Sequence, residues 1–272
     1  MSGFEIRTVS AREILDCRLE PTLRVAVETD GGVRGRADVP AGRSTGTHEA
    51  VEQRDGGDRY RGRGVRTAVR TVEEEVAPAL SGTDVRDQRA VDETLRDLDG
   101  TGRFAEIGAN TATGTSLATL KAAAESMNVP LYERVADVAG RAGTTLPIPF
   151  LDVIEGGELA ATDLDFQEHQ LIPTGAETFA EAIRMGAEVY HELGDRLAES
   201  YGRSSRNVGV EGGYTPPGMT DPREAFDEML GAVEECGYDD AFALAIDAAA
   251  THFYDPDAGT YSLMGEEHTP GE

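Results

Sequence analysis

Three acidic residues stand where carboxylates could share acid–base chemistry. Glu168 ends the segment DFQE, Glu211 opens EGGYTPP, and Asp247 follows apolar residues in FALAIDAAA. Acidic side chains at the strand ends of a βα barrel converge on one face, where two carboxylates could have split pKa values and a third could hold a divalent metal. Each of the three could equally be a solvated loop residue. Asp247 is the strongest candidate, because a lone Asp inside an apolar strand needs a partner or a metal.

The segment PAGRSTGTHEA, residues 40–50, is the second candidate for function. Its small polar residues offer too little apolar area to offset their conformational entropy, so it is predicted to be a loop. Such a loop could serve only as a connector. His48 is the one histidine considered for function, because the five histidines show no metal-ligand spacing. The two cysteines, Cys17 and Cys236, lie far apart, and no phosphate-binding or nucleophile-elbow motif appears.

The elements that must position these residues fall into two regions. Strands are predicted before residue 40, with a hairpin closed by DGG at 30–32. Helices follow at 66–80 and, alanine-rich and buried, at 110–127. From about residue 140, apolar strands at 148–154, 165–173 and 242–250 alternate with capped helices that begin at Thr178 and Asp221. This second pattern predicts a parallel sheet or a βα barrel. A complete barrel needs about 250 residues, so one begun here cannot close.

Charge and composition exclude several classes of partner. The 272 residues carry 51 acidic and 25 basic side chains, a formal net charge of −26. Such a chain repels nucleic acid and anionic membrane. It has no apolar run of membrane-spanning length and no signal-peptide pattern, so a soluble, cytoplasmic protein is expected. The acidic residues are scattered over well-patterned helices, which favours a surface adapted to salty cytoplasm, where salt screens the self-repulsion.

Seven motifs, in order along the chain, resemble those of enolase, the glycolytic phosphopyruvate hydratase. AREILDCRLEPTLRV resembles the family's AREILDSRGNPTVEV, PAGRSTGTHEAVEQRDG its PSGASTGIHEAVELRDG, and GVEGGYTPP its GDEGGFAP. RYRGRGV, IGANTATGTSLATLKAAA, LDFQEH and EAIRMGAEVYH add further matches. The resemblance implies an α+β N-terminal domain of antiparallel strands plus helices over residues 1–138. It implies the first part of an enolase-type α/β barrel, incomplete in this chain, over residues 139–272.

The resemblance also implies a chemistry and a role for each matching residue. The substrate would be 2-phosphoglycerate, dehydrated to phosphoenolpyruvate in a magnesium-dependent lyase reaction. Glu211 would protonate the departing hydroxyl, and Glu168, in the place of the family's FQE glutamate, would be the second catalytic residue. Gln167, in the place of the glutamine before it, and Ser44 would bind the substrate. Asp247 would bind the first magnesium ion, and Ser44, on a mobile lid, the second. The family also implies that the chain forms a homo-oligomer, such as a dimer, or associates with an enolase subunit.

Several positions depart from the family pattern. The family's base is a lysine from a late barrel strand, whereas Lys121, the one lysine here, belongs to the alanine-rich helix. Leu159 stands where the family has a substrate-contacting histidine, Val210 replaces an aspartate, and Leu19-Glu20 replaces Gly-Asn. Two interpretations stay open: a hydratase or its N-terminal part, and a catalytically inactive paralogue that acts as a binding protein. The chain itself could be a fragment or a natural truncation.

The acidic surface leads to a first prediction. At low ionic strength, unscreened repulsion among the excess carboxylates should unfold the purified protein, and molar salt should restore it. Far-ultraviolet circular dichroism across a potassium chloride series measures this. Full secondary structure and solubility without added salt would show that the surface is not adapted to salt.

Overall fold

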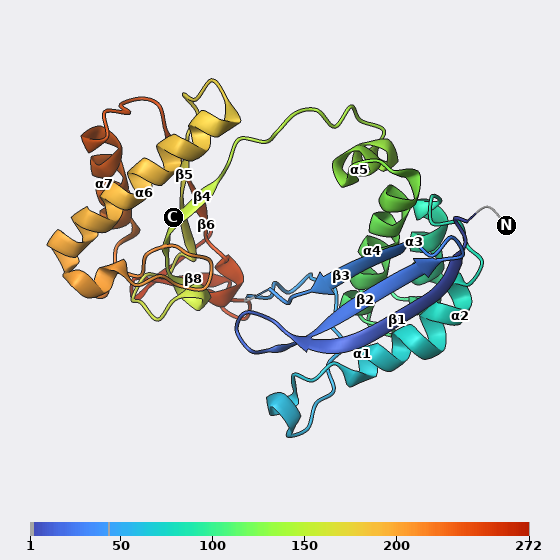
Figure 1. Cartoon of the computed structure of the whole chain (residues 1–272). Coiled ribbons are helices and arrows are strands. Elements are labelled where there is room, and N and C mark those ends of the chain that lie inside the picture. Colours follow the sequence, from blue (N-terminus) through green and yellow to red (C-terminus); the bar gives the residue numbers. More distant parts are fainter. Residues whose placement is uncertain (1–2, 43, 272) are drawn as a thin grey trace. The chain divides into compact units, whose positions relative to one another are not determined.

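The computed structural model describes residues 3–42 and 44–271 and divides the chain into two compact units (Figure 1). Among the described residues, the first unit comprises residues 3–42 and 48–145, and the second comprises residues 44–47 and 146–271. The elements of the first unit are β1 (Ile6–Leu15), β2 (Pro21–Thr29), β3 (Arg34–Val39), η1 (Arg59–Gly62), α1 (Arg66–Thr71), the π-helical turn η2 (Val72–Val76), α2 (Ala77–Leu80), α3 (Gln88–Asp99), α4 (Ala109–Met127) and α5 (Leu131–Ala139).

The first unit contains the predicted antiparallel sheet, in the order β1-β2-β3. The alternating residues Leu23, Val25 and Val27 all lie on its buried face, where none of them is exposed. The turn at residues 30–32 joins β2 to β3, and Val27 faces Gly35 in the resulting register. The hairpin prediction is therefore confirmed, because alternation and turn chemistry are local signals that packing here reinforces.

Helix α4 packs against β2 and β3 at unusually close range (Figure 1). A Cβ atom added at Gly35 would lie 2.1 Å from the Ala118 carbonyl oxygen and 2.3 Å from the Ala122 nitrogen. One added at Gly114 would lie 2.7 Å from a methyl group of Val25. The helix is rich in alanine and has a glycine at position 114 because its backbone almost touches the sheet, and larger side chains would not fit there.

The second unit contains two long helices and, among the described residues, two three-stranded sheets, one larger and one built of short strands (Figure 1). Its elements are β4 (Leu151–Glu155), η3 (Gly157–Leu159), β5 (Glu168–Ile172), α6 (Phe179–Tyr201), η4 (Arg203–Arg206), α7 (Pro222–Glu235), β6 (Ala243–Asp247), η5 (Ala250–His252), β7 (Tyr254–Asp255), β8 (Thr260–Leu263) and β9 (Glu266–His268). No helix in the part of the chain that the structure describes combines the length and apolarity needed to cross a bilayer.

Both helix starts in this unit are capped as predicted. The Thr178 hydroxyl accepts a hydrogen bond from the Glu181 N–H at 3.1 Å, and the Asp221 carboxylate accepts one from the Arg223 N–H at 2.9 Å. The Glu181 carboxylate reaches back to the N–H of Glu177, one residue before the capping-box position. These caps fix where α6 and α7 begin, and the two helices pack on each other.

The sheet of the second unit corrects two expectations. Its order is β4-β5-β6, and both pairings are antiparallel, so the parallel pairing predicted for these strands is wrong. Strand β6 was expected to be buried, but its residues are half-buried or exposed, and the Ile246 side chain is 42% exposed. The reason is its position at the edge of the sheet, where β5 is its one pairing partner among the described residues.

The stretch between the last helix of the first unit and β4 generates a second prediction. Residues 140–145 form no helix or strand and are exposed, whereas α4 is mostly buried. Trypsin should therefore cleave after Arg141 before it cleaves after Lys121, because a protease needs an unfolded stretch of backbone. Limited proteolysis followed by mass spectrometry measures the order. Initial cleavage within residues 110–126 would contradict the domain boundary proposed near residue 138.

Candidate functional site

The ends of the loop at residues 40–50 are held by hydrogen bonds within the first unit. The Thr22 hydroxyl donates to the carbonyl of Val39, and the Arg18 guanidinium donates to the carbonyl of Ala41 at 2.7 Å. Asp16 in turn accepts from the backbone N–H of Arg18 at 2.8 Å. These contacts fix the point at which the chain leaves β3.

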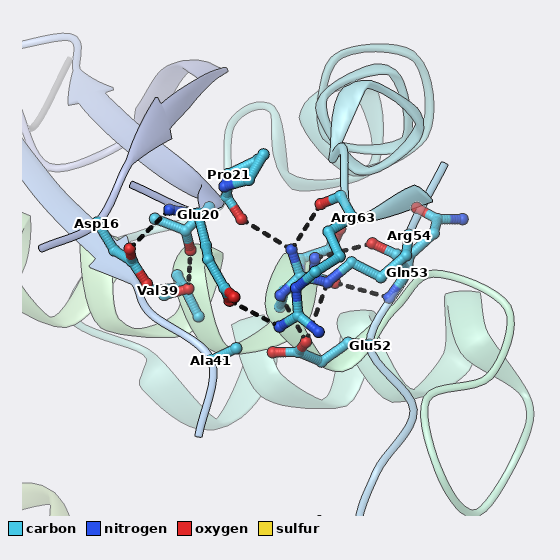
Figure 2. Close-up of polar contacts among 12 residues, drawn as sticks. Asp16, Glu20, Pro21, Val39, Ala41, Glu52, Gln53, Arg54 and Arg63 are labelled. Atoms are coloured by element: carbon cyan, nitrogen blue, oxygen red, sulfur yellow. Dashed lines mark hydrogen bonds and ion pairs between the residues drawn. The ribbon is translucent and has the colours of Figure 1, made fainter. Parts of the chain in front are cut away.

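The far end of the loop is held by Arg54 (Figure 2). Its guanidinium donates to the carbonyls of Pro21 and Arg63, at 2.8 and 2.9 Å, and forms an ion pair with Glu52 at 2.7 Å. Arg63 also pairs with Glu20 at 2.9 Å (Figure 2). The arginine thus ties the returning chain to the start of β2.

A reciprocal pair completes this anchor. The Asn110 side-chain amide donates to the Gln53 carbonyl and accepts from the Gln53 N–H, both at 3.1 Å. The loop residues between the anchors include Ser44, which is half-buried, and His48, which is exposed. Ser44 belongs to residues 43–47, which group with the second unit. Its predicted role toward substrate and metal stays a prediction.

In the second unit the structure brings three carboxylates together. Oxygen atoms of Asp152 on β4, Glu168 on β5 and Glu211 in the loop before α7 all lie within 4.8 Å of one another. Glu168 and Glu211 are the two residues predicted to do acid–base chemistry. Asp152 is a third member that sequence reasoning missed, although the argument applied to Asp247, an acid within an apolar strand, applies equally to it.

Asp152 is the carboxylate most strongly affected by its surroundings. Both of its oxygens are buried, and neither has a hydrogen-bond partner among the described residues. Burial, followed by repulsion from Glu155, Glu168 and Glu211, raises the pKa of Asp152 to about 8. Three carboxylates this close cannot all be ionised cheaply, and the most buried one keeps its proton.

Glu168 shows the same effect more weakly. Burial raises its pKa, the hydrogen bond donated by Gln170 at 2.6 Å opposes that, and the carboxylates of Glu211 and Asp247 raise it further. Its neighbour Gln167 is 4% exposed, and the side-chain carbonyl oxygen of Gln167 is buried without a partner among the described residues. The cluster can therefore hold a proton near neutral pH and pass it to a bound group.

Two family models match this chain, the N-terminal domain of enolase over residues 6–135 and the C-terminal barrel domain of enolase over residues 143–272. The chain belongs to the enolase family. It is 51% identical to the enolase of Methanopyrus kandleri over 98% of this chain and 62% of that protein. It is 47% identical to the enolase of Thermococcus kodakarensis and 48% identical to that of Pyrococcus furiosus, in each case over 99% of this chain and 62% of the relative.

Family membership confirms the predicted fold class, an α+β N-terminal domain followed by part of an enolase barrel. The chain spans 62% of the length of these relatives. The predicted residues of the second unit lie on the barrel part: Glu168 begins β5, with Gln167 directly before it, Glu211 lies in the loop before α7, and Asp247 ends β6. The antiparallel β4–β5 pair is thus the local geometry of an enolase family member.

Asp247 is the residue expected, by resemblance to enolase, to bind the first magnesium ion. Asp247 faces Glu168 across the β5–β6 ladder, is exposed, and accepts a hydrogen bond from the Ala249 N–H at 2.9 Å. Within residues 3–42 and 44–271, the one cluster with metal-binding spacing is Asp152, Glu168 and Glu211, without Asp247. Magnesium needs a near-octahedral oxygen shell, and a single exposed carboxylate does not supply it. The residues present do not form the expected enolase magnesium site.

The departures from the enolase pattern also have clear places in the fold. Lys121 lies on α4 of the first unit and is exposed. Leu159, at the histidine position, is 3% exposed and belongs to the buried core. Val210 precedes Glu211 in the loop and is 44% exposed. The apolar side chain of Leu159 can exclude water from this part of the unit but can neither donate nor accept a hydrogen bond.

The raised pKa of Asp152 generates a third prediction. The unfolded chain loses this proton near pH 4, while the folded protein keeps it to about pH 8. The folded state thus binds more protons in this window, so the free energy of unfolding falls as pH rises, by at most about 1.4 kcal/mol per pH unit. Asp152→Asn should flatten this slope.

Denaturant unfolding in high salt at pH 5, 6, 7 and 8 measures the slope. The exposed Asp239 supplies a matched control, since Asp239→Asn removes one carboxylate without relieving the cluster. Equal slopes in the wild-type protein and Asp152→Asn would show that Asp152 is ionised throughout the window.

Proposed function

We propose that this chain carries the lid and the proton-donating carboxylates of a phosphopyruvate hydratase, which dehydrates 2-phosphoglycerate to phosphoenolpyruvate in cytoplasmic glycolysis. The observation that carries the proposal is the convergence of Asp152, Glu168 and Glu211 within 4.8 Å in a member of the enolase family. A hydroxyl leaves carbon readily only when it is protonated, and an acid with a pKa near the working pH does this best.

In this proposal the residues of the chain divide the acid chemistry among them. Glu211 is the exposed member of the cluster and donates the proton to the departing hydroxyl. Glu168 and Asp152, which are more buried, keep a proton in the cluster and resupply it. Gln167 offers a free side-chain carbonyl to the substrate, and Ser44 closes over it from the loop.

The remaining parts of the reaction need groups that these residues do not supply. In enolase-type sites, magnesium stabilises the ene-diolate and a lysine or histidine removes the carbon proton. The single lysine lies on α4, and Asp247 alone does not complete a metal site. Hydratase activity, the phosphorylated substrate and the enolase-type dimer are therefore proposed for the protein joined to the rest of the relatives' length.

The second candidate function is a non-catalytic enolase-like protein that binds an enolase subunit. The observation favouring it is a pair of substitutions: Leu159 is apolar at the position of the family's substrate-contacting histidine, and Val210, directly before Glu211, replaces an aspartate. Each puts an apolar side chain where the family pattern has a polar one.

A chimera tests the two candidates. Residues 1–272 are joined to the remaining C-terminal length of the Methanopyrus kandleri relative, and phosphoenolpyruvate formation is followed in saturating magnesium and high salt. We expect the chimera to be active and Glu211→Gln to lower kcat by roughly 10²- to 10⁴-fold, because the proton donor is lost. The 272-residue chain alone should form no measurable product, since losing a base and most metal ligands removes the largest contributions.

Glu199→Gln is the matched control, because Glu199 is exposed on α6, away from the cluster, and should leave kcat unchanged. An active chimera that tolerates Glu211→Gln would contradict the proton-donor role. A folded but inactive chimera would contradict the hydratase proposal and favour the binding protein.

A further inference from the structure

Glu155, the last residue of β4, is a fully buried carboxylate, with 0% of its surface exposed. One oxygen, Oε1, accepts hydrogen bonds from the backbone N–H groups of Glu211 at 3.0 Å and Gly213 at 2.6 Å. The other oxygen, Oε2, is buried without a partner among the described residues. A buried carboxylate is costly unless it is hydrogen-bonded, so these two N–H groups are its main compensation.

The loop over this carboxylate is shaped to fit it. The Gly209 N–H donates to the Gly213 carbonyl at 2.9 Å and closes the loop on itself. A Cβ atom added at Gly209 would lie 2.0 Å from Glu155 Oε2, and one added at Gly213 would lie 2.9 Å from Glu155 Cγ. The glycines at 209 and 213 therefore let the backbone approach the carboxylate, whereas any side chain at these positions would clash with Glu155.

The flanks of the loop are fixed independently of this carboxylate. The Glu155 N–H donates to the Tyr214 carbonyl at 2.9 Å, and the Tyr214 N–H donates to the Val153 carbonyl at 2.8 Å. The Tyr190 hydroxyl donates to the Gly212 carbonyl at 2.7 Å, and its ring stacks on Tyr214 at 4.4 Å. The Glu155 side chain, in contrast, contacts the backbone of Glu211 itself and fixes its position.

We infer that Glu155 is a positioning residue: its carboxylate holds the backbone of Glu211 so that the Glu211 side chain meets Asp152 and Glu168. Glu155 touches none of the reacting atoms and acts through the loop. The effect of Glu155 on catalysis rests on the proposed function, whereas its hydrogen bonds to the loop, called here the hold on the loop, do not. A glutamine can make the same two contacts with its carbonyl oxygen, but an apolar side chain leaves both N–H groups without an acceptor.

Amide hydrogen exchange, resolved by nuclear magnetic resonance on the 272-residue chain in high salt, tests whether Glu155 holds the loop. The Tyr214 amide serves as internal reference, because its acceptor is the Val153 carbonyl. In Glu155→Met, exchange of the Glu211 and Gly213 amides should accelerate about tenfold or more relative to Tyr214, because both buried N–H groups lose their acceptor. Glu155→Gln should keep the wild-type ratio.

Leu193→Ala controls for general destabilisation. Leu193 lies fully buried in the same core, and its truncation should speed exchange across the unit without changing the ratio of Glu211 to Tyr214. Unchanged protection in Glu155→Met, or an equal loss in Glu155→Gln, would overturn the inference.

The chimera connects the hold to catalysis. There Glu155→Met should lower kcat at least tenfold with a smaller change in KM, and Glu155→Gln should restore kcat. Wild-type kcat in Glu155→Met would overturn the positioning role even if the exchange results held. If the chimera is inactive, the hydratase proposal fails, and the exchange ratios alone decide whether Glu155 positions Glu211.

Discussion

The hydrogen bonds from two loop N–H groups to the buried Glu155 carboxylate are the constraint on which the arrangement of the carboxylate cluster depends. They bring a loop from before α7 over the end of β4, and so bring Glu211 next to residues of two strands. The loop contains no helix or strand, so most of its backbone N–H and carbonyl groups need hydrogen-bond partners on other elements. Glu155, Tyr190 and the backbone of Val153 provide them.

The same arrangement gathers negative charge in a chain that already carries a net charge of −26. Asp152 and Glu155 lie three residues apart on β4, and Glu168 faces Glu155 across the ladder. In the described residues, none of the ion pairs involves Asp152, Glu155, Glu168 or Glu211. Protonation is then the cheapest way to lower the repulsion, which is the state a proton donor needs.

Local signals in the sequence predicted the local parts of this structure. Alternation and a turn motif located the β2–β3 hairpin, and Thr178 and Asp221 located two helix starts, because each depends on neighbours in sequence. The direction of β5 was mispredicted, although the segment 156–167 before it carries only the short η3 and no crossover helix. Asp152 carried the same signal as Asp247, an acid within an apolar strand, but only the fold shows that it meets Glu168 and Glu211 from other elements.

The close approach of α4 to the first sheet sets a different kind of limit on how this protein can change. At Gly35 and Gly114 the obstacle to any larger residue is the backbone or a branched side chain, which cannot move aside. Variation there is restricted by volume alone, whatever the chemistry of the new side chain. Around the carboxylates the restriction is on charge and hydrogen bonding, and residues of equal size are not equivalent. Substitutions should therefore be limited by size where α4 meets the first sheet, and by polarity as well at the carboxylate positions of the second unit.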